Sequence, residues 1–360
     1  MKNLVFRVDS SLKIGSGHVM RCITLANNLK KKKLLNCTFI TRAHEGNFNN
    51  IIKQNGFDVV YLPNENIDKS LDGYSDWLGT SQAQDAVQTL VALKGYGLES
   101  IDLLVVDHYS LDIQWEMAFR DTANKILVID DLANREHYCD IILDQNLAPN
   151  YQTRYDNLTP VHSKKFLGIS YCLLRDDFFN ARSLIKVREE LANILIFFGG
   201  VDKDNATLKL LFVLSEKLKV FESVNVIVGQ ANPFKSQIEE FCKPYNNCHY
   251  LEQVTNMAEL FSKSDLAIGA GGATTGERIF LGLPSIVFSL ADNQVAVSTY
   301  LHENQYITYL GDQEDIETSD IISELDKYIN SPRLLKNQSM KLLDVGESQL
   351  SHLIQEIAYD

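Results

Sequence analysis

The sequence predicts an α/β protein with two doubly wound domains, each built around a parallel sheet. Short apolar runs, typical of strands buried on both faces, recur along the chain. Stretches with helical spacing of apolar residues separate most of these runs, which favours parallel sheets with right-handed crossovers. The alternation starts a second time in the second half. With 360 residues, 45% of them hydrophobic, the chain is long enough for two such domains.

The first strand series predicts a domain over residues 1–175. The stretch Val19–Leu29 carries an apolar stripe typical of a helix packed on a sheet. Asn64–Tyr96 has mixed polarity and is interpreted as an excursion of helix and loop. The expected strands of this domain are Leu4–Val8, Cys37–Ile40, Val59–Leu62, Leu103–Val106, Ile126–Ile129 and Ile141–Leu143.

Residues 176–192 are charged and helix-like without a strand pattern, so they are expected to form the domain linker. The second domain is expected over 193–360 with C-terminal helices, and the helix pattern of Ser331–Ile357 is hypothesised to cross back over the cleft. Ligands of such folds bind at the carboxyl ends of the strands, which predicts a site between the domains. The expected strands are Ile194–Phe198, Val224–Val228, Leu266–Ile268 and Ser285–Phe288.

The composition of the chain limits the kinds of binding partner that we expect. A net charge of −13 argues against broad binding of nucleic acid or anionic membranes, although backbone amides can still hold a small anion. The six cysteines show neither Cys-x-x-Cys pairs nor zinc spacing and are interpreted as free thiols in a reducing compartment. The sequence shows no signal peptide and no run of 18 apolar residues, so a cytoplasmic protein is expected.

A glycine-containing turn after the first strand ends in a histidine. Residues 9–21 read Asp-Ser-Ser-Leu-Lys-Ile-Gly-Ser-Gly-His-Val-Met-Arg, and Gly15 and Gly17 allow tight turns that put His18 near a helix N-terminus. Partial positive charge there disfavours an imidazolium, so a neutral His18 can take a proton from water. The alternative is a turn histidine that caps the helix. The turn lacks the Lys-Ser/Thr of a P-loop and the third glycine of a dinucleotide fingerprint.

A second glycine-rich turn lies at residues 268–278, which read Ile-Gly-Ala-Gly-Gly-Ala-Thr-Thr-Gly-Glu-Arg. Gly271 and Gly272 let backbone amides approach an anion, and Thr274 adds a hydroxyl donor, which favours a pyrophosphate site. Glu277 lies one turn into the following helix, where a carboxylate suits ribose hydroxyls. The alternative is close packing of helix and strand with an ordinary first-turn glutamate.

Two further motifs of the second domain are expected to lie at the same cleft. Gly199 and Gly200 follow its first strand, and a plain strand–helix turn is the alternative. Asn293 and Gln294 follow another strand, where their amides can bond a ligand hydroxyl or phosphate. A polar helix start is the alternative for this pair.

Polar residues also follow two strands of the first domain. Asp107-His-Tyr109 ends one strand, and Asp130-Asp131 ends the next. Because ligands bind at the carboxyl ends of strands in open sheets, both are site candidates. The two neighbouring aspartates can share a proton or hold His18, and solvated carboxylates are the alternative.

Together these motifs resemble the UDP-sugar hydrolases of pseudaminic acid biosynthesis, which act on UDP-2,4-diacetamido-2,4,6-trideoxy-β-L-altropyranose. The likeness extends over about residues 4–310. It implies the GT-B fold, in which two Rossmann-like domains face each other across a cleft. The motifs that carry it are residues 6–11, 14–21, 106–109, 129–131, 168–175, 198–202, 269–277 and 293–294.

The resemblance implies roles for particular residues. His18 matches the catalytic base, Tyr109 the tyrosine near the sugar, and Glu277 the glutamate that binds the nucleotide. Arg188 is the nearest match to a substrate-contacting basic residue before the second domain. The turn expected to read Gly-Gly-Thr-Asp reads Gly-Gly-Val-Asp at 199–202, so one hydroxyl is missing. The other candidates are Asp9, Gly17, Arg21 and Asp131 for the substrate and Gly199, Gly200, Gly271, Gly272, Thr274, Asn293 and Gln294 for the nucleotide.

The implied reaction is hydrolysis of a UDP-sugar to free sugar and UDP, with C–O cleavage and inversion at C1. We expect a UDP-sugar partner, no nucleic-acid or membrane partner, no cofactor and no metal, and a monomer is favoured. The alternatives are a GT-B glycosyltransferase that uses a UDP-amino sugar, a UDP-sugar 2-epimerase and a non-catalytic nucleotide-sugar-binding protein. Loops such as 64–97 are expected to select the sugar.

Overall fold

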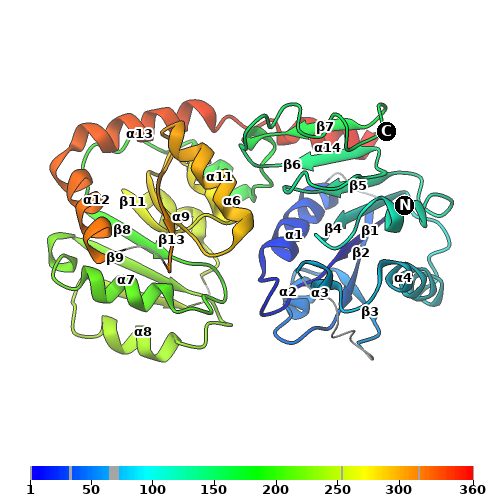
Figure 1. The fold of residues 1–360 in the computed structure, drawn as a ribbon, viewed down its shortest axis with the longest axis horizontal. Helices are drawn as coiled ribbons and strands as arrows, with labels where there is room; N and C mark the ends of the chain where they lie inside the picture. Colours follow the sequence, from blue (N-terminus) through cyan, green and yellow to red (C-terminus); the bar gives the residue numbers. More distant parts are fainter. Residues whose placement is uncertain (1, 32–34, 65–72, 253, 315–316, 360) are drawn as a thin grey trace. The chain divides into compact units, whose positions relative to one another are not determined.

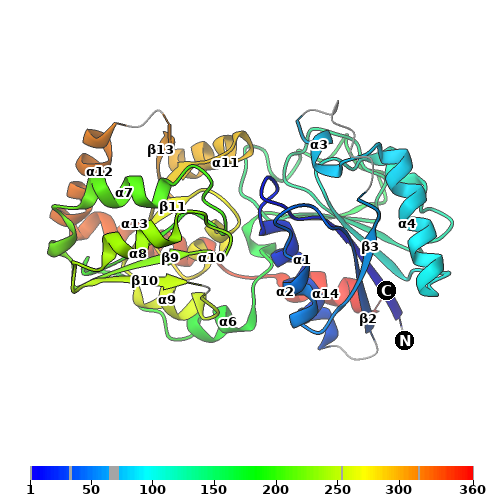
Figure 2. The same ribbon diagram turned by 90° about the horizontal axis from the view of Figure 1, so that it is seen from below.

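The computed structural model describes residues 2–31, 35–64, 73–252, 254–314 and 317–359. The chain divides into two compact units, each with its own parallel sheet and helices (Figures 1 and 2). The first unit comprises Met1–Asn146, Asn150–Leu173 and Gln349–Asp360, and the second comprises Leu147–Pro149 and Leu174–Ser348. The predicted α/β fold with two doubly wound units is confirmed.

The sheet of the first unit has seven strands in the order β3-β2-β1-β4-β5-β6-β7. The chain builds outward from β1 on one side and from β4 on the other, so the switch point lies between them. In register, Val5 pairs with Thr38 of β2 and Leu104 of β4. The strands are β1 (Lys2–Val8), β2 (Leu35–Arg42), β3 (Asp58–Leu62), β4 (Leu103–Asp107), β5 (Ile126–Ile129), β6 (Ile141–Asp144) and β7 (Lys164–Leu167).

Helices connect these strands and pack with the apolar side chains of the sheet. The core of the unit includes Trp115, Phe119 and Tyr155. Residues 65–72 of the predicted excursion at 64–97 lie outside the described part of the chain. The helices are α1 (Gly17–Lys30), α2 (Asn49–Gln54), α3 (Ser75–Leu78), α4 (Gln82–Tyr96), α5 (Ile113–Met117), the 3₁₀ helix η1 (Ile169–Tyr171) and α14 (Leu350–Tyr359).

The sheet of the second unit has six strands in the order β10-β9-β8-β11-β12-β13. Its switch point lies between β8 and β11, where Ile196 pairs with Ile268. Both glycine turns of this unit therefore follow the two switch-point strands. The strands are β8 (Asn193–Phe197), β9 (Ser223–Val228), β10 (Cys248–Glu252), β11 (Leu266–Ala270), β12 (Ser285–Ser289) and β13 (Thr308–Asp312).

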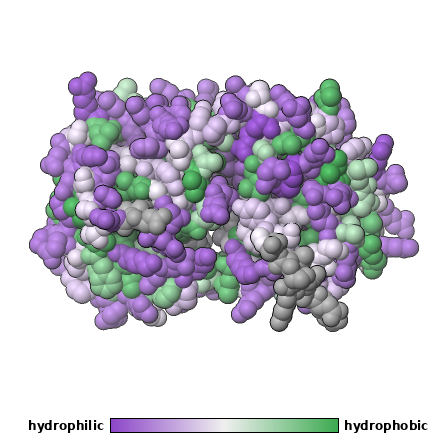
Figure 3. Space-filling view, viewed as in Figure 1, coloured by the Kyte–Doolittle hydropathy of each residue, from purple (hydrophilic) through white to green (hydrophobic). Residues whose placement is uncertain are grey.

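The helices of the second unit flank this sheet. They are α6 (Asp176–Arg182), α7 (Ala206–Leu214), η2 (Leu218–Val220), α8 (Lys235–Cys242), α9 (Met257–Lys263), α10 (Thr274–Phe280), α11 (Asp292–Glu303), α12 (Thr318–Asn330) and α13 (Pro332–Val345). Among the helices of the described residues, none has both the length and the apolar character needed to cross a bilayer. On the face drawn in Figure 3, hydrophilic side chains are interspersed with smaller groups of hydrophobic ones.

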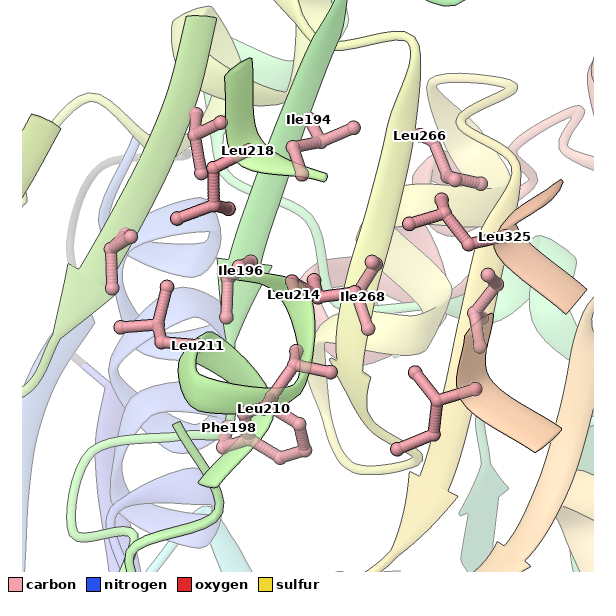
Figure 4. Packing of buried hydrophobic residues seen from close by; sticks show 14 of the residues in the cluster. Ile194, Ile196, Phe198, Leu210, Leu211, Leu214, Leu218, Leu266, Ile268 and Leu325 are labelled. Carbon is pink, nitrogen blue, oxygen red and sulfur yellow. The ribbon is translucent and has the colours of Figure 1, made fainter. Parts of the chain in front are cut away.

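Apolar side chains of strand and helix interlock in the second unit (Figure 4). The cluster includes Ile194 and Ile196 of β8, Leu211 and Leu214 of α7, and Ile268 of β11. All five are fully or almost fully buried. This packing fixes the ends of β8 and β11, from which the two glycine turns leave.

Two boundaries differ from those expected. The segment 176–192 is part of the second unit, because Phe178 of α6 is buried and Arg182 donates to backbone carbonyls of that unit. The C-terminal pattern forms two helices, since α13 ends at Val345 and α14 starts at Leu350. The helix α14 belongs to the first unit, where it packs with α1 and η1.

Candidate functional site

His18 lies at the switch point of the first unit, in the first turn of α1. Its Nδ1 is 2.6 Å from Oδ1 of Asp107, the last residue of β4. Burial raises the pKa of Asp107, but the Arg21 guanidinium and His18 outweigh this and hold the pKa below its usual range. An ionised carboxylate only accepts, so Nδ1 carries a proton, and in the neutral imidazole Nε2 then presents its lone pair. This arrangement suits a general base.

Arg21 follows His18 by one helical turn and lies on the same face of α1. Its Nε and one terminal nitrogen each donate to Asp107 at 2.6 Å, and the other terminal nitrogen donates to Asp131 at 3.0 Å. Both Arg21 and Asp107 are buried. A bidentate guanidinium fixes the plane of a carboxylate. Arg21 therefore positions Asp107, and through it the imidazole.

Tyr109 lies against the same imidazole. The ring centroids of Tyr109 and His18 are 4.6 Å apart, in an edge-on arrangement. The Tyr109 hydroxyl donates to Asp131, and burial together with Asp131 raises the pKa of Tyr109, which keeps it a phenol. Asp131 also accepts from Asn146. The structure thus brings His18, Arg21, Tyr109 and Asp131 together. These residues follow the ends of three strands, β1, β4 and β5.

The idea that the paired aspartates hold His18 or share a proton is wrong. Asp107 holds the imidazole, whereas Asp131 holds Arg21 and Tyr109. Asp130 is fully buried and binds Arg135 at 2.7 Å and the Tyr155 hydroxyl at 2.8 Å. Burial raises the pKa of Asp130, but Arg135 and His137 together lower it by more. The pKa is therefore below its usual range, and this carboxyl stays ionised.

Asp9 has a different environment from the one expected. Its carboxylate is fully buried and accepts from Arg7 at 2.7 Å and from the backbone N–H of Arg42 at 2.6 Å. These bonds fix the end of β1 against β2. We therefore leave Asp9 out of the proposed substrate contacts. Gly17 is the first residue of α1, and Gly15 adopts φ +77°, a conformation that favours glycine in the turn before His18.

In the second unit, Gly271 and Gly272 follow β11 and precede α10. A Cβ on Gly271 would lie 2.4 Å from the Ser298 hydroxyl of α11, so close packing alone requires this glycine. A Cβ on Gly272 would meet only the Gln294 side-chain nitrogen, at 3.7 Å. The Gln294 oxygen accepts from the N–H of Leu290, which orients its amide. The structure therefore brings Gly271, Gly272 and Gln294 together.

Glu277 lies in α10, and Thr274 is the first residue of this helix. Burial raises the pKa of Glu277 to about 7, and Asp177 adds to this while Arg175 and Arg278 oppose it. Arg278 donates to the carbonyl of Ala270 at 2.7 Å, which ties α10 to the end of β11. Glu277 is thus held beside the glycine turn with a charge that changes near neutral pH. Asn293 starts α11 next to Gln294.

Gly199 and Gly200 form the turn after β8. Gly199 adopts φ +98°, and a Cβ on Gly229 would come within 2.1 Å of the Gly200 carbonyl oxygen. The backbone of this turn is therefore tightly placed. Asp202 accepts from the N–H groups of Ala206 and Thr207 at 2.7 and 3.0 Å, so its carboxylate caps α7.

Arg188 has a structural environment. It is buried, with 6% of its surface exposed. Its guanidinium donates to four backbone carbonyls, which satisfies most of its donors inside the second unit. We therefore leave Arg188 out of the proposed site. The carbonyls belong to Phe261, Ser264, Leu281 and Gly282.

In the described part of the chain, no three His, Cys, Asp or Glu side chains are grouped so that they could hold a metal ion. Sequence reasoning treated Asp107 as part of a motif and missed it as the partner of His18. The register of β1 beside β4 would have revealed this partner, because Val8 pairs with Asp107.

Comparison with known proteins finds similarity over much of the chain. Residues 194–356 match the glycosyltransferase family 28 C-terminal domain. The chain is 25% identical over 304 residues to the UDP-2,4-diacetamido-2,4,6-trideoxy-β-L-altropyranose hydrolase of Campylobacter jejuni, covering 84% of this chain and 97% of that one. The resemblance found in the motifs is confirmed.

Two further similarities define the fold and the extent of the match. An uncharacterized protein of Methanocaldococcus jannaschii is 27% identical over 286 residues, and the match covers 78% of this chain but only 54% of that relative, about half its length. The crystal structure of MurG from Acinetobacter baumannii superposes with a TM-score of 0.66 at 15% identity, covering 99% of both chains. The protein has the GT-B fold of two Rossmann-like units and is related to GT-B glycosyltransferases.

Proposed function

We propose that the protein hydrolyses a UDP-activated diacetamido-trideoxy hexose to the free sugar and UDP, as a step of pseudaminic acid biosynthesis. The observation that carries the proposal is the Asp107–His18 pair at the switch point of the first unit. The hydrolase of Campylobacter jejuni, which the chain resembles over most of its length, supports the substrate class.

In this mechanism Asp107 holds the Nδ1–H of His18, and Nε2 takes a proton from water. The water oxygen forms a bond to C1 of the sugar while the bond from C1 to the diphosphate oxygen breaks. The electron pair of that bond leaves with UDP. Attack opposite the leaving group inverts C1, as in inverting glycoside hydrolysis. Because UDP is a good leaving group, no strong general acid is required.

The nucleotide is assigned to the second unit. Backbone amides of Gly199, Gly200, Gly271 and Gly272 are proposed to bind the diphosphate, with the Thr274 hydroxyl and the amides of Asn293 and Gln294 as further donors. Glu277 is proposed to accept from the ribose hydroxyls. The strands β8 and β11 are parallel neighbours, so the two glycine turns that follow them leave the same edge of the sheet. This placement supports the assignment.

The pH dependence of nucleotide binding tests the role of Glu277. Its carboxyl is protonated below its pKa of about 7 and ionised above it, and the ionised form is the better acceptor. The affinity for a UDP-sugar, whose diphosphate diester does not titrate in this range, should rise about fivefold from about pH 6 to about pH 8. Titration calorimetry measures this. Glu277→Gln should bind with no such rise, and an unchanged pH dependence in this variant would remove Glu277 from the ribose site.

Incubation with the UDP-sugar and no acceptor tests the function. Nuclear magnetic resonance of the mixture should show free sugar and UDP in equal amounts. A glycosyltransferase, which the family 28 domain favours as the second candidate, would leave the substrate unchanged until an acceptor is added. A UDP-sugar 2-epimerase would yield a changed sugar, and a binding protein would yield no product. Any of these three results would overturn the hydrolase proposal.

A further inference from the structure

Two aromatic side chains, Trp77 and Tyr109, lie beside the imidazole of His18, and a third, Tyr74, packs against both of them. The Trp77 and Tyr109 rings stack with centroids 5.3 Å apart and an interplanar angle of 27°, and Tyr74 contacts both at 4.9 and 5.0 Å. The Trp77 and His18 centroids are 6.0 Å apart, with the rings nearly perpendicular. We refer to Tyr74, Trp77 and Tyr109 as the aromatic wall. A sugar attacked by a water on His18 would be within reach of this wall.

The wall is held in place by its own segment. Leu78 of α3 is buried in the core of the first unit, the Ser110 hydroxyl donates to the Tyr74 carbonyl, and Lys13 forms an ion pair with Asp76. These contacts join α3 to the loop after β4 and to the turn before α1. Trp77 is therefore positioned relative to His18 from both sides.

Trp77 is not needed to fill the core. The chain has two tryptophans, and the other one, Trp115, is 1% exposed, belongs to the core cluster and donates from its indole nitrogen to Asp85. Trp77 is half-buried and lies outside that cluster. A large aromatic ring that keeps part of its surface in water beside a candidate base is typical of a ligand-binding position.

The chemistry of the wall favours apolar groups of a sugar. The Tyr109 hydroxyl is committed to Asp131, so Tyr109 presents its ring toward His18. The electron-rich faces of indole and phenol attract C–H groups and methyls, whereas a sugar hydroxyl placed there would lose its hydrogen bonds with water. Such a surface discriminates a deoxy or acetamido sugar from a fully hydroxylated hexose.

We propose that Trp77 is a specificity-determining residue, whose indole forms the surface against which the sugar of the UDP-sugar rests and which favours methyl and acetamido groups over hydroxyls. This inference rests on the proposed function, since it concerns the sugar of the same substrate. It assigns sugar selection to a residue of the first unit, whereas the proposed function assigns only the nucleotide to the second unit.

Steady-state kinetics of the full chain gives the first test. Trp77→Ala should raise KM for the diacetamido-trideoxy UDP-sugar roughly tenfold, the size of a lost aromatic contact, while kcat falls less. The inhibition constants of UDP and of UDP-glucose should change less than twofold, since neither has an apolar sugar group to lose. Trp77→Phe should restore most of the KM. Tyr96→Ala removes a half-exposed aromatic ring on α4 and serves as the matched control. An unchanged KM in folded Trp77→Ala overturns the inference.

Indole fluorescence provides a second test that does not require turnover. In the His18→Asn variant, addition of the UDP-sugar should change the emission, whereas UDP alone should not. In the same variant carrying Trp77→Phe, only the signal of the buried Trp115 remains, and the change should disappear. Equal responses to UDP and UDP-sugar would overturn the inference. Binding with the expected response but no hydrolysis by the wild type would overturn the proposed function alone, and no binding of the UDP-sugar would overturn both.

Discussion

Replacing His18 with asparagine should lower kcat for UDP-sugar hydrolysis by about 10²–10⁴-fold, the usual contribution of a positioned general base. Asparagine keeps a polar side chain at the start of α1 but cannot take the proton of the attacking water. The affinity for UDP should stay unchanged, because the nucleotide is assigned to the other unit. Stopped assays analysed for released UDP give kcat, and calorimetry gives the affinity.

Two further variants make this result specific. Asp107→Asn should also lower kcat, because an amide can donate to Nδ1 and favour the wrong tautomer of the imidazole. Combining it with His18→Asn should add little, since the two residues act as a unit. His162→Asn changes an exposed histidine of the same unit and should behave as the wild type. A His18→Asn variant that keeps most of its activity would exclude His18 as the base.

Replacing Asp85 with alanine should destabilise the first unit by about 3–5 kcal/mol, as expected when one partner is removed from a buried ion cluster. The Asp85 carboxylate is fully buried and accepts from Arg7 at 2.7 Å, Arg42 at 2.8 Å and the Trp115 indole at 3.0 Å. Without it, two guanidinium groups lose a buried counter-charge. Such a loss is a large part of the total stability of a domain.

Urea unfolding followed by tryptophan fluorescence measures this change. Both tryptophans, Trp77 and Trp115, belong to the first unit, so the transition reports on that unit. Glu259→Ala breaks an exposed ion pair with Lys263 and should leave the stability close to that of the wild type. Because Glu259 lies in the second unit, its variant should leave the fluorescence transition in place. A midpoint of Asp85→Ala equal to that of the wild type would contradict the importance of the cluster.

The central strands of both sheets could be predicted from the sequence, whereas three edge strands could not. The strands β7, β10 and β13 each lie at an edge of a sheet. An edge strand has exposed positions, as in the Lys-Lys-Phe-Leu sequence of β7, and lacks the continuous apolar run that marks a central parallel strand. The division of the C-terminal pattern at Gly346 was also missed, because helical spacing continues on both sides of the break.

Short sequence motifs were enough to name residues that lie close together in the fold. His18, Arg21, Tyr109 and Asp131 were named from local sequence, and the structure places them in one cluster. The partner of His18 was missed because it is distant in the chain, and only strand pairing brings it near.

Two residues expected in the substrate site, Asp9 and Arg188, are buried charges with structural partners. Asp9 and Arg188 are of residue types common in binding sites, but tertiary packing encloses both with backbone and ion partners. Nothing in the local sequence distinguishes such a residue from a solvent-facing one. Trp77 gave no motif signal either, and its closeness to His18 depends on how α3 packs beside the loop after β4.

The most direct measurement runs the reaction in ¹⁸O-water without an acceptor and locates the label by mass spectrometry. If water held by His18 attacks C1, one ¹⁸O atom appears in the released sugar and none in UDP. Label in UDP would mean attack at phosphorus, and the proposed role of the Asp107–His18 pair would be contradicted.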